Sequence, residues 1–375
     1  MTFRRDRLTW VAYALLAWFA YLQAAPGLVV PYLRDELDIG YTTGGLHVAA
    51  FATGSVLAGL TAARIEAAAG RRALLWGSAA VMAVGATGLV AGHVAAVTVG
   101  ALFVAGYGGG LLLTTVQATL ADHHGEQRAI ALTEANVFAS AAYLVLVAAV
   151  ALVSWRAALI ASFAVPLALF LANRHVPITG APPAAATEGR LPRAFPVAMA
   201  MLFCAVAAEW CVTSWGASFA REAADVSADT AVALMFGYFG GVFAGRATAS
   251  RLARRHAPQR LLALALAIAA VGFAVLWPAT SPVQVLAGLA VIGLGLGNLF
   301  PFALAVTVAL APDRAQLASS RAVLAGSSAV LIAPLTIGAL ADATSITGAL
   351  LVVPVTLALA TIGLVATTPR GRSRR

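Results

Sequence analysis

The sequence contains no lysine, and all 24 of its basic residues are arginine. A phosphate-binding loop of the form G-x-x-x-x-G-K-[ST] is therefore excluded, which argues against an ATP-driven pump within this chain. Charge of either sign is scarce, because only 10% of the 375 residues are charged and 61% are hydrophobic. A soluble domain carries about 25% charged residues. Most of the surface of this protein is therefore expected to face lipid.

Residues that form disulfides and metal sites are also few. Cys204 and Cys211 are the only cysteines, and on one predicted helix their Cα atoms would lie about 10 Å apart. A disulfide needs less than about 7 Å, so we interpret both as packing thiols. The adjacent His123 and His124 lack the i, i+4 spacing of a helical metal pair, so we interpret residues 122–128 as a solvated loop and expect no metal.

Long runs without Asp, Glu or Arg predict membrane spans, each of which needs about 20 apolar residues. Five runs hold one span each, and two longer runs hold two spans each, with breaks near Gly92 and at 278–282. Two further spans contain a single glutamate, and one ends near Arg246, which gives twelve spans in all. In the same order, these runs are residues 8–33, 39–63, 157–173, 322–341 and 343–369; 73–121 and 261–312; 129–155 and 194–220; and 230–250.

The arginines are distributed unevenly over the loops between these spans. With a cytoplasmic N-terminus, 21 of the 24 lie inside and only Arg34, Arg156 and Arg221 lie outside. This asymmetry obeys the positive-inside rule, and it accounts for the net charge of +9 without a nucleic-acid partner. We therefore predict a multi-pass protein of the plasma (cytoplasmic) membrane with both termini in the cytoplasm.

The longest polar connection lies near the middle of the chain, at residues 173–193, and is rich in Pro, Ala and Gly. This composition is typical of a flexible linker, and the topology places it in the cytoplasm. It separates an N-terminal six-helix bundle, residues 1–172, from a C-terminal six-helix bundle, residues 194–375.

The two halves share glycine patterns. Ser55-x-x-x-Gly59 matches Gly241-x-x-x-Gly245, and GYGGG at 106–110 matches GLGLG at 293–297. The two matches have nearly the same offset, which is close to half of the chain. Small residues let membrane helices approach closely, and glycine also marks points where helices bend. We interpret these positions as packing or hinge sites of an internal repeat. The glycines of the second pattern are Gly106, Gly108, Gly110, Gly293, Gly295 and Gly297.

Over nearly its whole length the chain resembles the major facilitator superfamily. The family's basic signature between helices two and three is matched by GLTAARIEAAAGRR, and the second half echoes it from Gly245 onward. Ala63 stands where the family has Asp, no Arg stands near Leu102 in helix four, and helix five lacks the Gly-Pro of many drug/proton antiporters. The resemblance implies two six-helix bundles and a cytoplasmic middle loop. The signature positions that fit are Gly59, Arg64, Gly70, Arg71 and Arg72.

Glu209 is the only formal charge between Arg193 and Arg221. It lies about 18 Å of helix away from Arg221, near the bilayer midplane, where an ionisable residue costs about 2.5–3.5 kcal/mol. Such residues usually face a cavity and carry protons or bind ligands. The alternative is a neutral carboxyl that hydrogen-bonds a neighbouring helix. We predict that Glu209 is the proton-coupling or cation-binding group.

In the resembled fold, helices one, four, seven and ten border a central cavity, so polar groups on them are candidates for substrate binding. Gln23 is the counterpart of Glu209 under the offset that relates the two halves, and Thr213 shares the face of Glu209 one turn away. For the aromatic members, packing is the alternative role. The predicted cavity residues are Gln23, Gln117, Thr213, Asn298, Trp210 and Tyr238.

Glu134 and Arg321 occupy matching positions in the two halves, under the same offset that relates the glycine triplets. Both lie near the predicted cytoplasmic ends of their helices. In the resembled fold, helix five packs beside helix eight and helix eleven beside helix two. The resemblance therefore implies an interior gate in which Glu134 meets Arg246, and in which Arg321 approaches the region of Gly59–Glu66, where Glu66 stands in for the missing Asp of the signature. The alternative for Glu134 is an ordinary interfacial charge.

Together these features predict a secondary active transporter with alternating access. Because the predicted cavity holds one carboxylate and no obvious cation, a small neutral or cationic organic solute is favoured, with protons as the coupling ion. Import of a small solute and export of an amphipathic, drug-like compound are both open, as is a non-transporting membrane receptor. An intramembrane lipid enzyme is disfavoured, because only His47 among the histidines falls within a span. We expect no enzymatic activity, no cofactor, and a monomer whose partners are the lipid bilayer, the substrate and protons.

Overall fold

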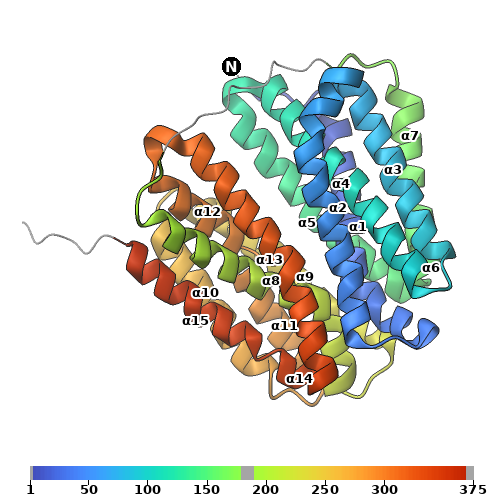
Figure 1. The fold of residues 1–375 in the computed structure, drawn as a ribbon, viewed down its shortest axis with the longest axis vertical. Coiled ribbons are helices and arrows are strands. Elements are labelled where there is room, and N and C mark those ends of the chain that lie inside the picture. The colour runs from blue at the N-terminus through green and yellow to red at the C-terminus, as the bar shows by residue number, and fades with distance from the viewer. Residues whose placement is uncertain (1–2, 179–189, 369–375) are drawn as a thin grey trace, which may run out of the picture. The chain divides into compact units, whose positions relative to one another are not determined.

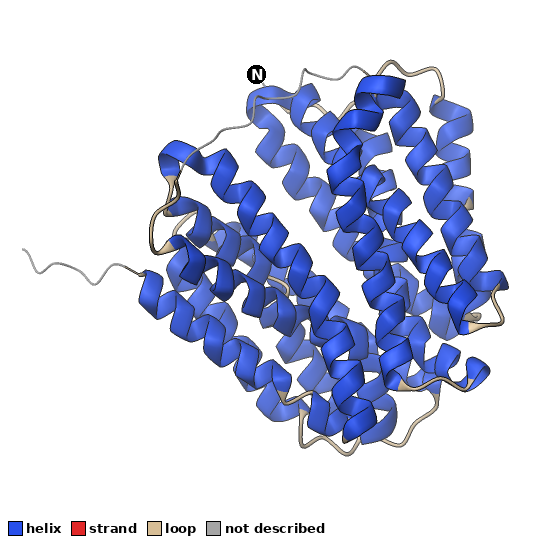
Figure 2. Cartoon of the chain, viewed as in Figure 1, coloured by secondary structure: helices blue, strands red, loops and turns tan. Residues whose placement is uncertain are grey.

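The computed structural model describes residues 3–178 and 190–368, and within these ranges it contains helices and loops but no strand (Figure 2). The predicted linker at 173–193 lies mostly outside the described residues. The helices are α1 Arg7–Leu37, α2 Tyr41–Ala69, α3 Arg71–Ala91, α4 Ala95–His124, α5 Arg128–Leu152, α6 Trp155–Ser162, α7 Ala164–Asn173, α8 Phe195–Ala223, α9 Ala228–Leu252, α10 Pro258–Leu276, α11 Pro282–Leu296, α12 Leu299–Ala309, α13 Ala315–Ala343, α14 Ile346–Ala349 and α15 Val352–Thr367, with 3₁₀ turns η1 Gly125–Gln127 and η2 Pro312–Arg314.

The helices account for the predicted membrane spans. In the described part of the chain, 11 continuous helical runs are long and apolar enough to cross a membrane. One of them, Ala95–Leu152, has 58 residues and contains both α4 and α5, which are separated at Gly125 by a backbone with φ of 51°. The helices also stop where the sequence predicts, after Ala91 and between Leu276 and Pro282. The prediction of an all-α membrane protein with twelve spans is confirmed.

The chain divides into two compact units. Unit 1 comprises Met1–Ala184 and Val226–Phe236, and unit 2 comprises Ala185–Asp225 and Gly237–Arg375. The helix α9 therefore contributes to both units. Its first turn is linked to α1 within unit 1, because the hydroxyl of Tyr32 donates to Asp229 at 2.7 Å. The predicted bundle boundaries at 1–172 and 194–375 stay a prediction.

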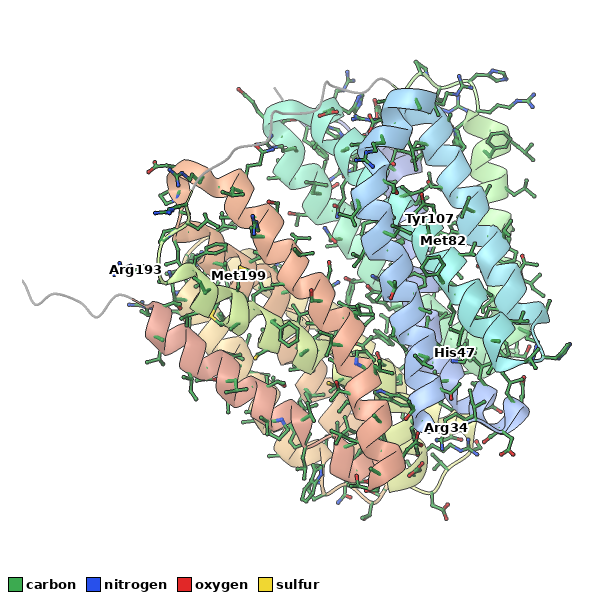
Figure 3. All side chains as sticks on the ribbon, in the orientation of Figure 1. Arg34, His47, Met82, Tyr107, Arg193 and Met199 are labelled. Carbon is green, nitrogen blue, oxygen red and sulfur yellow. The ribbon has the colours of Figure 1, made fainter. Side chains whose placement is uncertain are left out.

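In unit 1, α4 packs against both α2 and α3, and α1 packs against α5 (Figure 1). Glycines make the α4 contacts close. A Cβ atom added to Gly106 would lie 2.0 Å from the carbonyl oxygen of Phe51 on α2, and one added to Gly108 would lie 2.3 Å from the amide nitrogen of Met82 on α3. Figure 3 labels Met82 in this interior, together with Tyr107, whose hydroxyl lies 3.1 Å from that of Thr61. Gly110, the third glycine of the pattern, lies against Ser55 and Ala58 of α2.

Unit 2 repeats this arrangement. There α8 packs against α12, α13 and α15, and α11 packs against α10 (Figure 1). A Cβ atom added to Gly293 would lie 2.2 Å from the carbonyl oxygen of Tyr238 on α9, one at Gly295 would meet α10, and one at Gly297 would meet α9. The two glycine triplets thus alternate between equivalent neighbouring helices, as the predicted repeat requires.

The shorter pattern is repeated less faithfully. In unit 2, Gly241 and Gly245 both lie against the backbone of α11. In unit 1, Ser55 reaches α4 through a hydrogen bond of 3.0 Å to the carbonyl of Gly106, whereas nothing lies within 4 Å of a Cβ added to Gly59. Gly59 is therefore not a packing position within its unit.

The tenth span, expected from the sequence to be one helix, is broken into α11 and α12. Pro301 stands in the first turn of α12 and has no amide hydrogen. An uninterrupted helix would direct that hydrogen to the carbonyl of Gly297, four residues earlier. The break therefore leaves the Gly297 carbonyl available to a donor from another helix.

Candidate functional site

The carboxylate of Glu209 lies beside a guanidinium group in unit 2. Glu209 stands at the midpoint of α8, Phe195–Ala223, and its Oε1 atom is 3.7 Å from an Nη atom of Arg246 on α9. The Glu209 side chain is 13% exposed and that of Arg246 is 27% exposed. The two groups therefore form an ion pair, largely withdrawn from solvent, at the middle of a membrane helix.

Arg246 is held by the break between α11 and α12. Its Nε–H donates to the carbonyl of Gly297 at 3.0 Å, which is the carbonyl that Pro301 leaves without a helical donor. One end of the guanidinium is thus fixed to the broken helix while the other end faces Glu209. Arg246 consequently links α9 to α8 and to the break between α11 and α12.

The backbone of α8 at Glu209 is fixed by two hydroxyl groups. The Thr213 hydroxyl donates to the carbonyl of Glu209 at 2.8 Å, and the Tyr238 hydroxyl approaches the same carbonyl at 3.3 Å. The two hydroxyl oxygens are themselves 2.7 Å apart. Both groups therefore position the turn of α8 that carries the carboxylate.

Few other charges reach this pair from the surrounding helices. In the described sequence, α11, α12, α14 and α15 contain no Asp, Glu, His or Arg, and α13 contains only Arg321 and Asp342, near its two ends. The other charged residues of α9 are Asp229 and Arg251, in its first and last turns. In so apolar a surrounding, a charge that loses its partner is costly, and breaking a buried pair from one side costs about 3–5 kcal/mol. The two members of the pair are therefore strongly dependent on each other.

The predicted cavity residues of unit 2 have unequal exposure. Trp210 and Thr213 are half-buried, but Tyr238 is only 1% exposed and packs on Phe239 at a ring distance of 5.1 Å. Asn298 is 6% exposed and donates to the carbonyl of Leu294 at 3.3 Å. Tyr238 and Asn298 therefore support the helices around the ion pair, and their place in a substrate cavity stays a prediction.

In unit 1, the counterpart of Glu209 has an uncharged setting. Gln23 is half-buried, and its side-chain oxygen accepts a long hydrogen bond of 3.4 Å from the hydroxyl of Tyr143. Gln117 is also half-buried, on α4. The position equivalent to Arg246 falls at Gly59 or Leu60, which supply no cation. The ion pair is thus a feature of unit 2 alone.

His47 occupies a fully buried position between α2 and α4. Its Nδ1 atom lies 2.7 Å from the carbonyl oxygen of Thr43, and its Nε2 atom lies 2.8 Å from the hydroxyl of Thr98. A carbonyl only accepts, so Nδ1 carries a hydrogen and donates it to Thr43. Both ring nitrogens are engaged in packing the two helices together.

Two of the predicted gate residues, Glu134 and Arg246, have partners within their own units. Glu134 accepts two hydrogen bonds from Arg5, at 2.7 and 2.8 Å, and a third from the hydroxyl of Tyr13 at 3.1 Å. Hydrogen bonding and the charge of Glu134 raise the pKa of Arg5. Arg246 approaches Glu209, and Arg321 is exposed. A gate that pairs Glu134 with Arg246 stays a prediction.

The signature between α2 and α3 forms a small charged cluster. Gly70 adopts a φ of 81°, which favours glycine, and Arg71 follows it directly. Arg71 is 7% exposed and binds Glu66 at 2.7 Å, and it also binds Asp122 at the end of α4. The remaining matched positions, Gly59, Arg64 and Arg72, are exposed. Glu66 thus pairs with a signature arginine, and its predicted contact with Arg321 stays untested.

The partner of Glu209 was not predicted from the sequence. Arg246 was expected only at the inner end of its span, yet α8 and α9 are joined by a short turn after Ala223. Glu209 lies about four helical turns before Ala223, and Arg246 lies about five turns after Ala228. At about 1.5 Å per residue their backbones differ in depth by about 6 Å, which an arginine side chain spans. Counting outward from the turn places the two residues at similar depths, but the rotation of each helix decides whether they face each other.

The N-terminal segment was also missed. Asp6 caps α1 through the amide and hydroxyl of Thr9, at 2.9 and 2.7 Å, and contacts His123 at 2.6 Å. Partial burial raises the pKa of the Asp6 carboxyl, but the bonds from Thr9 and His123 outweigh it and hold that pKa below its ordinary value. The signal in the sequence is Asp6-x-x-Thr9 directly before an apolar run, which is typical of a helix start.

Comparison with known proteins agrees with this architecture. A family model described as Major Facilitator Superfamily matches residues 9–279 and 198–375. A crystal structure of a mutant of the nucleoside transporter NupG has a TM-score of 0.76 and 11% identity, covering 96% of this chain and 99% of that one. A bacterial homologue of the human lysosomal transporter Spinster, inward-facing and unoccupied, has a TM-score of 0.72 and 13% identity, covering 96% and 97%.

Identities this low show a shared fold and nothing finer. Comparison with curated proteins finds no matching sequence. The family model nevertheless covers nearly all of the chain, and the helices that it matches are long and apolar enough to span a membrane. The chain belongs to the major facilitator superfamily, as a multi-pass membrane transport protein.

Proposed function

We propose that this protein is a secondary active transporter that moves a small organic solute across the plasma membrane by alternating access, with proton coupling through Glu209. The observation that carries the proposal is the ion pair of Glu209 and Arg246, separated by 3.7 Å at the middle of α8. Ionisable groups at such depth are costly and commonly belong to ion or substrate pathways.

The pair has a chemistry suited to coupling. A proton that binds Glu209 neutralises the carboxylate and removes its attraction for Arg246, and loss of the proton restores it. Because Arg246 also binds the broken segment at Gly297, the proton would change the interactions of α8 with α9 and α11. A local charge change that biases such a contact is a general way to drive a conformational switch.

The solute was expected to be neutral or cationic because no cation was recognised near Glu209. Because the guanidinium of Arg246 lies 3.7 Å from Glu209, that expectation no longer has a basis. The similarity to a nucleoside transporter, at 11% identity, does not identify the solute. The direction of transport, import or export, depends on whether the solute moves with the proton or in exchange for it.

The first test is the removal of the titrating group. Ligands are found by a thermal-shift screen of small organic solutes, and the best one is used in proteoliposomes with an imposed proton gradient. We expect Glu209→Gln to abolish gradient-driven accumulation, because the amide cannot take up and release a proton. Exchange of labelled for unlabelled solute at equal concentrations should persist, because exchange needs no proton cycle.

The control variant is Glu126→Gln, which removes an exposed carboxyl from the 3₁₀ turn after α4. It should accumulate solute as the wild type does. Accumulation by Glu209→Gln at the wild-type level and with the wild-type pH dependence would mean that Glu209 has only a structural role.

A further inference from the structure

The geometry points to a small organic anion as the solute, with its carboxylate binding Arg246 in the place that Glu209 vacates when it takes up a proton. This inference rests on the proposed function and names the substrate class of the same site. It starts from the balance of charges. The pair of carboxylate and guanidinium is neutral by itself, and a protonated Glu209 beside a guanidinium that holds an external carboxylate is neutral as well.

The intermediate combinations are charged. A proton alone adds one positive charge to the site, and a bound anion alone adds one negative charge. Both are costly among helices that bring so few other charges to the site. Proton and anion therefore favour each other's binding, and a neutral solute would gain nothing from the protonation of Glu209.

The contacts of Arg246 suit this exchange. Its Nε–H is held by the Gly297 carbonyl at 3.0 Å, so the guanidinium keeps its place when Glu209 is neutralised. The distance of 3.7 Å to Glu209 is longer than the 2.7–2.9 Å, roughly, of a good charge-assisted hydrogen bond. An incoming carboxylate can therefore approach Arg246 more closely than Glu209 does in this structure.

Exposure supports the same assignment. The Arg246 side chain is 27% exposed, whereas Tyr238 and Asn298 are almost completely buried and already bonded. The guanidinium is thus a charged group beside Glu209 that a solute can reach. A carboxylate is the planar anion that matches it best.

The experiment measures binding to the full-length protein in detergent. The probes are pairs of the same shape that differ in charge: benzoate with benzamide, nicotinate with nicotinamide, and lactate with lactamide. We expect at least one carboxylate to bind while its amide does not, and to bind more tightly in acidic than in alkaline buffer. If no carboxylate binds better than its amide, the inference is wrong.

Variants test the two partners separately. Arg246→Gln should weaken carboxylate binding by about 10- to 100-fold, since a hydrogen bond to a charged group contributes about 1.5–3 kcal/mol. Glu209→Gln imitates the protonated carboxyl, so it should bind the carboxylate tightly in both buffers. The control Arg260→Gln, at an exposed arginine on α10, should bind as the wild type does.

Two results with the variants would also overturn the inference: unchanged affinity in Arg246→Gln, or a wild-type pH dependence of binding in Glu209→Gln. If Arg246→Gln does not fold, the second result decides alone. Failure of the proposed function looks different. If a carboxylate binds at Arg246 but its uptake does not depend on the proton gradient, proton coupling is refuted and the substrate class is supported. If uptake of an amide depends on Glu209, coupling is supported and the substrate class is refuted.

Discussion

At the scale of single residues, Glu134 is the acceptor on which a buried hydroxyl depends. Tyr13 is 1% exposed and donates to Glu134 at 3.1 Å, so Glu134→Ala leaves this hydroxyl without that partner. A buried polar group deprived of its partner costs about 1–3 kcal/mol. We expect Glu134→Ala to lower the free energy of unfolding by about this amount, and Arg5→Ala to have a smaller effect. Chemical denaturation in micelles measures both. Adding Tyr13→Phe to Glu134→Ala should recover most of the loss; if it recovers none, the hydroxyl is not the cause.

Single residues of the site could be predicted from the sequence, but their partners on other helices could not. Glu209 was found because a single charge in an apolar run is visible without a structure. Its partner was not, because pairing across two helices depends on how each helix is rotated and on the Gly297 carbonyl that Pro301 exposes. Likewise Arg71 was recognised from the signature, but Asp122, 51 residues away, was recognisable only once α4 lay beside the loop.

At the scale of helices, close packing on glycine is the feature that can be tested most directly. A Cβ at Gly106 would lie 2.0 Å from a carbonyl oxygen, and at Gly293 2.2 Å, whereas Gly59 faces open space within its unit. We expect Gly106→Ala and Gly293→Ala each to cost about 1–3 kcal/mol through overpacking. Gly59→Ala should be neutral or stabilising by up to about 1 kcal/mol, because alanine favours the helix. Thermal unfolding of the three variants measures this; equal destabilisation of all three would contradict the packing argument.

Helix positions were predictable for a physical reason. The bilayer demands long uncharged runs, and charges or turn residues mark their ends, so breaks such as the one at Gly92 were located from the sequence. The break between α11 and α12 was not, because Pro301 is tolerated within many membrane helices and only its surroundings decide whether the helix parts. The glycine repeat was likewise visible as a pattern, but the loss of the Gly59 contact was not.

At the scale of the whole molecule, the arginine distribution makes a prediction about sidedness that the fold alone does not. With 21 of 24 arginines on alternate loops, the turn between α9 and α10 should be cytoplasmic and the turn after α13 should be external. Ala253 and Ala343 are exposed residues in or next to these two turns. In a background of Cys204→Ala and Cys211→Ala, we expect a membrane-impermeant maleimide to label Ala343→Cys in intact cells. Ala253→Cys should react only after the membrane is permeabilised. The two substitutions are chemically identical, so each controls for the reactivity of the other. The opposite pattern would invert the orientation and place both termini outside.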